Sequence, residues 1–151
     1  MRLQRLSLEE AADAAAVHRA AFDERLPWLA GLHTPAQDRV FFREHVFRSC
    51  AVEGAFADDR LIGIIAYREK WIDQLYVLPD AQGRGVGSAL LEQARAVHDD
   101  LSLWTFQRNR RARSFYEARG FKQVEETDGS NNEEREPDVL YRWVRDSGRA
   151  R

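Results

Sequence analysis

A glycine-rich turn between a strand pattern and a helix pattern constrains this chain more than any other feature. The apolar run Leu75–Leu78 indicates a strand, the turn Gly83–Gly87 follows it, and Ala89–Ala94 then has a helical pattern. Glycines let backbone N–H groups converge on a phosphate, and the N-terminus of a helix adds partial positive charge. The order of strand, turn and helix therefore predicts an anion site, although glycine turns also occur as plain tight connections.

Two common phosphate-binding loops do not fit this turn. A P-loop requires a lysine directly after its last glycine, and Ser88 stands there instead. The dinucleotide fingerprint G-x-G-x-x-G, begun at Gly83, requires a third glycine at the same position. It also requires an acidic residue at the end of the next strand, where the chain has Phe106 and Gln107. Both loops are therefore excluded.

Patterns along the whole chain predict one α/β domain. Ser7 and Thr34 each open a capping box at the start of a helix. In the second helix, Val40, Phe41 and Phe47 are expected to face inward. Strands are expected at residues 2–6, 50–57, 61–67, 71–78, 101–106, 121–126 and 139–144, and helices at 7–24, 38–47, from the glycine turn to about 98, and 112–119. This order predicts a mixed, mostly antiparallel sheet of about seven strands flanked by four helices, over residues 1–145, with a frayed tail at 146–151.

The composition excludes several classes of protein. The 151 residues carry a net charge of −2 from 23 Lys+Arg and 25 Asp+Glu, which is too balanced for general nucleic-acid binding. No apolar stretch is long enough to span a bilayer, so no membrane association is expected. Cys50 is the only cysteine, which precludes an intrachain disulfide and favours a reducing, cytoplasmic setting. We interpret Cys50 as a buried small residue at the start of a strand.

No metal site is expected either. His18, His45 and His98 fall on predicted helices without metal-ligand spacing, so we interpret them as surface or packing residues.

Two motifs resemble one known family. The pattern Gln82-x-x-Gly85-x-Gly87, after a strand ending in Val-x-Pro, resembles the acetyl-CoA pyrophosphate loop of the GNAT N-acetyltransferase superfamily. Residues 109–121 read N-x-x-A-x-x-F-Y-E-x-x-G-F, which is similar to the second block of that superfamily. The resemblance covers roughly residues 50–125. It implies a GNAT-like fold with a splayed central strand pair and acetyl-CoA as a co-substrate, without a metal.

The resemblance also implies which residues bind the cofactor. In this superfamily the strand before the glycine turn splays at a bulge, and its freed backbone groups pair with the pantetheine arm. A backbone N–H near Leu75 or Tyr76 would then stabilise the oxyanion that develops on the thioester. Asn109 matches the position that bonds the cofactor arm, and as a helix N-cap it has a second explanation. The implied cofactor-binding set is Leu75, Tyr76, Val77, Gln82, Gly83, Arg84, Gly85, Val86, Gly87, Ser88, Asn109, Ala112, Phe115 and Tyr116.

Tyr116 and Asp73 are the candidates for proton transfer. The tyrosine of the F-Y-E element lies near the thioester sulfur in the superfamily, so Tyr116 is implied as the general acid, with packing under the cofactor as the alternative. Asp73 precedes the oxyanion donor Leu75 by two residues, and strand alternation puts the two on the same side unless a bulge lies between them. It is therefore a candidate base, or else a strand carboxylate that bonds its neighbours. Its competitors are Glu69, Glu134 and Glu136.

The acceptor site is implied to lie among the first helices, the splayed strands and the loop before the last strand. Trp28 and His33 belong to an apolar stretch that forms either a pocket wall or a staple between two helices. Trp71, Asp73 and the acidic segment around Glu134 complete the set of substrate candidates. An acidic rim attracts a cationic amine, although acidic loops are usually just solvated.

These assignments leave several functions open. The leading interpretation is transfer of an acetyl group from acetyl-CoA to the primary amine of a small molecule, in a ternary complex. The alternatives are a non-catalytic acyl-CoA sensor, and an acetyltransferase for protein N-termini or lysines. Pairing of edge strands makes a homodimer possible.

Overall fold

The computed structural model describes residues 1–146, and its strands agree closely with those expected from the sequence. Within these residues seven strands follow the order β1-β2-β3-β4-β5-β7-β6. The strands are β1 (Arg2–Arg5), β2 (Ala51–Ala57), β3 (Arg60–Arg68), β4 (Trp71–Val77), β5 (Asp100–Phe106), β6 (Lys122–Thr127) and β7 (Asp138–Val144). The mixed, mostly antiparallel sheet is thereby confirmed. The frayed tail predicted at 146–151 lies outside the described residues, apart from Asp146.

The helices begin where their capping signals predict, with one shift. Thr34 Oγ1 accepts a hydrogen bond from the Gln37 N–H at 3.1 Å, and the Gln37 side chain accepts from the Thr34 N–H at 2.8 Å. At Ser7 the Glu10 carboxylate accepts from the backbone N–H at 2.9 Å, but a 3-10 turn comes before the α-helix. The helices are α1 (Ala11–Arg25), α2 (Pro35–Phe41), α3 (Phe47–Ser49), α4 (Val86–Val97) and α5 (Arg110–Ala118), with 3-10 turns η1 (Leu8–Glu10), η2 (Pro27–Leu29) and η4 (Pro79–Ala81), and the π-helix η3 (Phe42–Val46).

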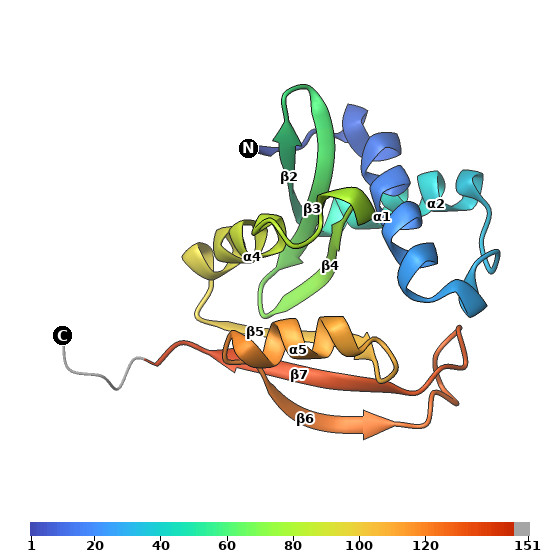
Figure 1. Ribbon diagram of the computed structural model, residues 1–151, viewed down its shortest axis with the longest axis vertical. Helices are drawn as coiled ribbons and strands as arrows, with labels where there is room; N and C mark the ends of the chain where they lie inside the picture. The colour runs from blue at the N-terminus through green and yellow to red at the C-terminus, as the bar shows by residue number, and fades with distance from the viewer. Residues whose placement is uncertain (147–151) are drawn as a thin grey trace. The chain divides into compact units, whose positions relative to one another are not determined.

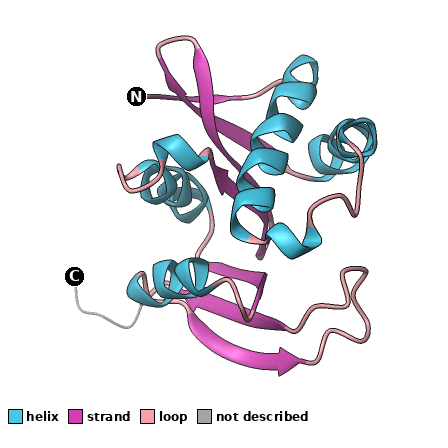
Figure 2. Cartoon of the chain, turned by 45° about the vertical axis from the view of Figure 1, so that its right-hand side comes forward, coloured by secondary structure: helices cyan, strands magenta, loops and turns pink. Residues whose placement is uncertain are grey.

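The described chain divides into two compact units. Unit 1 comprises Met1–Arg68 and Ile72–Ala96, and unit 2 comprises Glu69–Trp71 and the chain from Val97 onward. Figure 1 shows α1, α2 and α4 with the strands β2, β3 and β4, and α5 with β5, β6 and β7. Figure 2 shows the same chain coloured by its helices, strands and loops. Each unit is described in turn.

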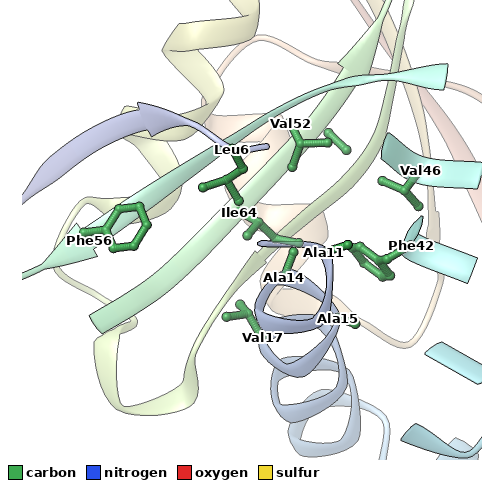
Figure 3. Packing of buried hydrophobic residues seen from close by; sticks show 11 residues of the cluster. Leu6, Ala11, Ala14, Ala15, Val17, Phe42, Val46, Val52, Phe56 and Ile64 are labelled. Atoms are coloured by element: carbon green, nitrogen blue, oxygen red, sulfur yellow. The ribbon is translucent and has the colours of Figure 1, made fainter. Parts of the chain in front are cut away.

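The core of unit 1 lies between α1, the second helix and the sheet. Ala14 and Val17 of α1 pack with Phe42 and with Ile64 of β3, and the small alanines let α1 approach the strands closely (Figure 3). Tyr76 and Leu78 pack against the edge of this cluster. The end of β4 that precedes the glycine turn is therefore supported directly by the core.

The inward face of the second helix differs from the expected one. Val40 and Phe41 are exposed, so their predicted inward orientation is wrong, whereas Asp38, Phe42 and Val46 are buried. Phe42 and Val46 belong to the π-helix η3. Phe47, the third residue expected to face inward, packs against the core cluster, so the expectation is confirmed for that residue.

A buried ion pair joins α1 to α2. Arg19 Nε donates to Asp38 Oδ2 at 2.7 Å, and a second guanidinium nitrogen donates to Asp38 Oδ1 at 2.8 Å. Asp38 is only 6% exposed, so this bidentate geometry offsets a large desolvation cost. Arg19 also donates to Asp23, one turn further along α1, at 2.9 Å. The pair fixes how α2 leaves the loop that follows α1.

Gly63 lets α4 lie directly on β3. A Cβ at this position would come within 2.9 Å of Val86 Cγ1 and 3.0 Å of Leu90 Cδ1. Both distances are shorter than ordinary carbon contacts, so any larger residue would push the first turns of α4 outward. Alternation along β3 turns Ile64 toward α1 and Gly63 toward α4, so the two helices cover opposite faces of the strand.

Unit 2 is an antiparallel sheet that carries α5. β7 pairs with both β5 and β6, and Trp71 pairs with Ser102 in a parallel bridge. The Tyr141 hydroxyl of β7 donates to Glu117 at 2.5 Å and accepts from Arg113 Nε at 3.0 Å. Gly120, with a φ of +89°, follows the end of α5, close to the expected helix end at 119. These contacts fix the rotation of α5 on its sheet.

We predict that Asp38→Ala destabilises the protein by about 3 kcal/mol, because it leaves the Arg19 guanidinium buried with one partner lost. Urea denaturation measures the change. The matched control is Asp23→Ala, which removes a more exposed partner of the same arginine and should cost less than about 1 kcal/mol. Equal effects of the two variants would contradict the assignment.

Candidate functional site

The glycine turn between β4 and α4 has the backbone conformation that an anion-binding loop requires. Gly83 and Gly85 have φ values of +79° and +82°, in the left-handed region that favours glycine. A Cβ added at either position would meet nothing within 4 Å, so conformation rather than space requires glycine here. Alternation of left-handed and ordinary residues turns successive N–H groups toward one side. Gly83, Arg84 and Gly85 are exposed, so a ligand can reach their amides.

Gln82 closes this turn onto the end of β4. Its Nε2 donates to the Val77 carbonyl at 2.9 Å, and its Oε1 accepts from the Arg25 guanidinium at the end of α1. The glutamine of the motif is therefore a clasp between strand, turn and helix. The Val77 carbonyl has an intramolecular partner, as does the N–H of Leu78, which donates to Ile62 O at 2.8 Å. Leu75 and Tyr76, both half-buried, directly precede Val77 on β4.

Asp73 is held by two side chains from neighbouring strand ends. Arg68 Nε donates to Asp73 Oδ2 at 2.8 Å, and the Cys50 thiol donates to the same oxygen at 3.2 Å. Burial, together with the hydrogen bond to Asp73, raises the pKa of Cys50 to about 12. Cys50 therefore stays a thiol, as expected of a residue that is not a nucleophile, but it is half-buried rather than fully buried. The hydrogen bond with Asp73 also raises the pKa of Arg68, which keeps its charge.

In unit 2 the second motif builds the start and the inner face of α5. Asn109 Oδ1 accepts from the Ala112 N–H at 3.2 Å, so the N-cap interpretation of Asn109 is confirmed. Tyr116 is 7% exposed, and its ring lies nearly edge-on to those of Phe115 and Phe121, with centroids 5.2 and 5.3 Å away. The ring of Tyr116 is therefore held in one orientation by aromatic packing.

The substrate candidates differ in how they are held. Trp28 is 45% exposed, whereas His33, Trp71 and Glu134 are half-buried. Trp28 and His33 belong to unit 1 together with Asp73, and Trp71 and Glu134 belong to unit 2 together with Tyr116.

The acidic loop before β7 is organised by its own contacts. The buried carboxylate of Glu136 accepts from two nitrogens of Arg108 at 2.9 and 3.0 Å. Asn132 Nδ2 donates to the Glu136 carbonyl at 2.8 Å, and a Cβ on Gly129 would lie 2.4 Å from the same residue. Glu136 is thus a structural residue, and its charge is neutralised by Arg108.

Two side chains of unit 1, His18 and Gln74, have buried polar atoms that the sequence did not predict. The imidazole of His18 contacts the rings of Phe22, Phe42 and Tyr76, with centroids 5.6, 5.4 and 4.7 Å away. His18 Nδ1 is buried without a hydrogen-bond partner, and so is Gln74 Oε1 on β4. The helical spacing of Ala11, His18 and Phe22 indicates that His18 faces inward, but nothing in the sequence marks its nitrogen as unpaired.

Burial controls the charge of His18. It lowers the pKa of the imidazole to about 4, since the charged form loses water, and Arg19 and His33 act in the same direction. Asp38 and Asp23 act against this shift but do not offset it. His18 is therefore neutral near pH 7.

Two further properties bear on function. Over residues 1–146 no helix combines the length and apolar character needed to cross a membrane. In the same residues His, Cys, Asp and Glu form no group of three or more that could hold a metal ion.

The glycine turn and the start of α5 both lie in a part of the chain that matches one family. Residues 40–123 match the acetyltransferase (GNAT) domain, which is more than half of the chain. The chain therefore belongs to the GNAT acetyltransferase family, and the resemblance noted in its motifs is confirmed.

Individual relatives support this assignment. The chain is 35% identical over 69 residues to the peptidyl-lysine N-acetyltransferase YiaC of Escherichia coli K12, a match that covers 45% of this chain and 47% of that protein. It is 42% identical over 52 residues to the "Probable N-acetyltransferase Rv2775" of Mycobacterium tuberculosis, covering 33% and 30%. These alignments span less than half the length of the curated relatives.

Solved structures share the whole fold. The apo form of YjaB from Escherichia coli superposes with a TM-score of 0.78 at 21% identity, over 95% of this chain and 97% of that one. The PaiA N-acetyltransferase of Thermoplasma acidophilum, solved in complex with coenzyme A, gives a TM-score of 0.70 at 23% identity, over 95% and 98%. At these identities the comparison establishes the fold.

We predict that His18 makes the protein less stable in acid. Because the folded pKa is about 4 and the ordinary value is 6.5, unfolding takes up a proton between these two pH values. The stabilisation is complete above pH 6.5 and declines as the pH falls to about 4, by roughly 3 kcal/mol. Urea denaturation from pH 7 to pH 4 measures this loss.

The variant His18→Phe should lose this part of the pH dependence while keeping the aromatic packing. His45→Gln, an exposed position on the second helix, is the matched control and should follow the unsubstituted protein. A His18→Phe protein with an unchanged pH dependence would show that another group is responsible.

Proposed function

We propose that this chain is an N-acetyltransferase that moves the acetyl group of acetyl-CoA to a primary amine within a ternary complex. The observation that carries this proposal is the left-handed turn at Gly83 and Gly85, exposed between a core-supported strand and the start of α4. The family assignment makes the pyrophosphate of coenzyme A the natural anion for that turn.

The residues of the turn fit such a ligand. The amides of Gln82–Ser88 would bind the pyrophosphate, and the clasp from Gln82 to Val77 keeps them aligned with β4. The close contact at Gly63 holds the first turns of α4 against the sheet, which directs the positive end of the helix dipole to the same place. Leu75 and Tyr76 would then supply backbone groups to the pantetheine arm and to the thioester oxygen.

Tyr116 is proposed as the general acid. In the reaction the amine nitrogen bonds to the thioester carbon, the carbon–sulfur bond breaks, and the sulfur leaves with the bonding pair. The Tyr116 hydroxyl would give this sulfur its proton. Support comes from the second motif and from the ring contacts that hold Tyr116 in one orientation, since an acid acts only from a fixed position.

Asp73 is proposed as the group that receives the proton of the amine, directly or through a water molecule. Its carboxylate is oriented by Arg68 and Cys50, and its second oxygen, Oδ1, is not used by either of them. Of its competitors, the buried carboxylate of Glu136 is engaged by Arg108, whereas Asp73 is exposed.

The acceptor is proposed to be a primary alkylamine. In the sequence, the bulky Trp28 and Trp71 and the long acidic loop before β7 favour a closed pocket. A closed pocket would suit a small-molecule acceptor. Two observations favour the lysine side chain of a polypeptide: Trp28 is 45% exposed, and the relatives YiaC and YjaB are named peptidyl-lysine N-acetyltransferases. A small-molecule alkylamine and a lysine side chain present the same reacting group. Because the two observations favour lysine, the lysine side chain is tested first. The cytoplasmic setting and a homodimer stay predictions.

A thiol-release assay with acetyl-CoA tests the function directly. Lysine-containing peptides, free polyamines and amino acids form the acceptor panel, and mass spectrometry identifies the acetylated nitrogen. Tight binding of coenzyme A without thiol release for any acceptor would favour the non-catalytic sensor instead.

We predict that Tyr116→Phe lowers turnover about 100-fold, because the thiolate must then leave unprotonated. The affinity for coenzyme A, measured by calorimetry, should change less than about threefold because the ring contacts persist. Phe121→Leu, which alters packing beside the same ring without removing a hydroxyl, serves as the control. Unchanged turnover in Tyr116→Phe would rule out the acid role.

We predict that Asp73→Asn removes the acidic limb of the pH profile of kcat/KM and lowers the rate about 100-fold at neutral pH. The acidic limb reports protonation of the base, so its loss follows from losing the carboxylate. The neighbouring exposed carboxylate provides the control Glu69→Gln, which should retain the limb. An intact acidic limb in Asp73→Asn would assign the base elsewhere.

A further inference from the structure

Two hydrogen-bonding atoms of unit 1 are buried without a partner. They are His18 Nδ1 on α1 and Gln74 Oε1 on β4. Buried polar atoms are nearly always paired in folded proteins, because each unpaired atom costs free energy. Neither atom has a role in holding the fold, so their retention needs another explanation.

Both residues neighbour Tyr76 of β4. Side chains two residues apart on a strand point to the same side, so Gln74 shares its face with Tyr76. The ring of Tyr76 meets that of His18 nearly perpendicularly, with centroids 4.7 Å apart. Gln74 and His18 therefore both adjoin Tyr76, in the strand segment that the proposed function uses for transfer.

Both atoms are hydrogen-bond acceptors. An amide oxygen can only accept. The neutral imidazole carries one proton on two nitrogens, and a buried unpaired N–H is rarer than a buried unpaired lone pair. The proton is therefore assigned to Nε2, which is not among the buried unpartnered atoms, and Nδ1 keeps its lone pair.

We propose that His18 and Gln74 bind the acceptor amine, each accepting one N–H hydrogen bond from it. This inference rests on the proposed function and names the part of unit 1 that recognises its acceptor. Two acceptors match a primary amine or ammonium, which offers several N–H donors, and they disfavour carboxylates and phosphates, which offer only acceptors. The surrounding rings of Phe22, Phe42 and Tyr76 suit the alkyl chain of such an amine.

His18 is a binding residue in this proposal and not the base. Its burial among aromatic rings disfavours a protonated imidazole, as the lowered pKa shows. An imidazole that stays neutral keeps its lone pair for the amine throughout the reaction. Both residues are half-buried, so each side chain reaches the surface of unit 1 in part.

Two variants test the pair, and each retains the size of the side chain. His18→Phe and Gln74→Met remove the acceptor atoms, and the controls His45→Phe and Gln93→Met make the same changes elsewhere on unit 1. For each protein we would measure KM for the amine, with Nα-acetyl-lysine amide as the probe, and KM for acetyl-CoA.

The expected result is a rise of about tenfold in KM for the amine in each variant, which corresponds to loss of one hydrogen bond to a charged or strongly polar donor. KM for acetyl-CoA should stay within about twofold, and thermal stability should hold or increase because an unpaired buried atom has been removed. An unchanged KM for the amine in both variants would overturn the proposal and leave the atoms as partners of a buried water.

A binding experiment separates this proposal from the proposed function. If the unsubstituted protein releases no thiol with any acceptor, the proposed function fails on its own. Calorimetry with Nα-acetyl-lysine amide, and with Nα-acetyl-norleucine amide as the probe lacking the amine, then tests the pair without catalysis. Binding of the lysine probe alone, lost in His18→Phe, supports the pair; equal behaviour of the two probes contradicts it.

Discussion

The left-handed backbone of Gly83 and Gly85 is the constraint on which the rest of this site depends. It turns the chain from β4 into α4 within a few residues and leaves a row of amides exposed. The turn keeps its shape because Gln82 bonds back to Val77 and forward to Arg25, and because Gly63 lets α4 rest on β3. A short exposed loop is thereby held by the core of unit 1.

Polar groups inside unit 1 fall into two kinds, and the difference separates stability from function. Arg19 and Asp38 satisfy each other with two short hydrogen bonds, so they hold α1 and α2 together at a tolerable desolvation cost. The atoms His18 Nδ1 and Gln74 Oε1 lack such partners. Gln74 lies on β4, the strand that precedes the turn, and His18 contacts Tyr76 of the same strand. A protein retains unpaired buried atoms at the expense of stability, which is the pattern found where a ligand completes the hydrogen bonding.

Local signals predicted most of the fold, and one failure shows why they have limits. The two strands β2 and β3, the capping box at Thr34 and the end of α5 near residue 119 depend on neighbouring residues and were predicted correctly. In the second helix Val40 and Phe41 were wrongly predicted to face inward, whereas Phe47 was predicted correctly. The buried residues there, Phe42 and Val46, pack in a cluster with α1 and β3, and no local pattern contains contacts with such distant residues.

The sequence by itself determined the family, because both motifs are short runs of neighbouring residues. The first motif specifies the turn at Gly83–Gly87, and the second specifies the start of a helix at Asn109. It also determined that Tyr116 and Asp73 are the residues to test. Only the tertiary structure decided their surroundings: Asp73 meets Arg68 and Cys50 from two other strand ends, Glu136 is neutralised by Arg108, and His18 adjoins Tyr76. The physical reason is that these contacts join residues far apart in the chain, and burial, which controls their charge and their unpaired atoms, exists only once the elements have packed.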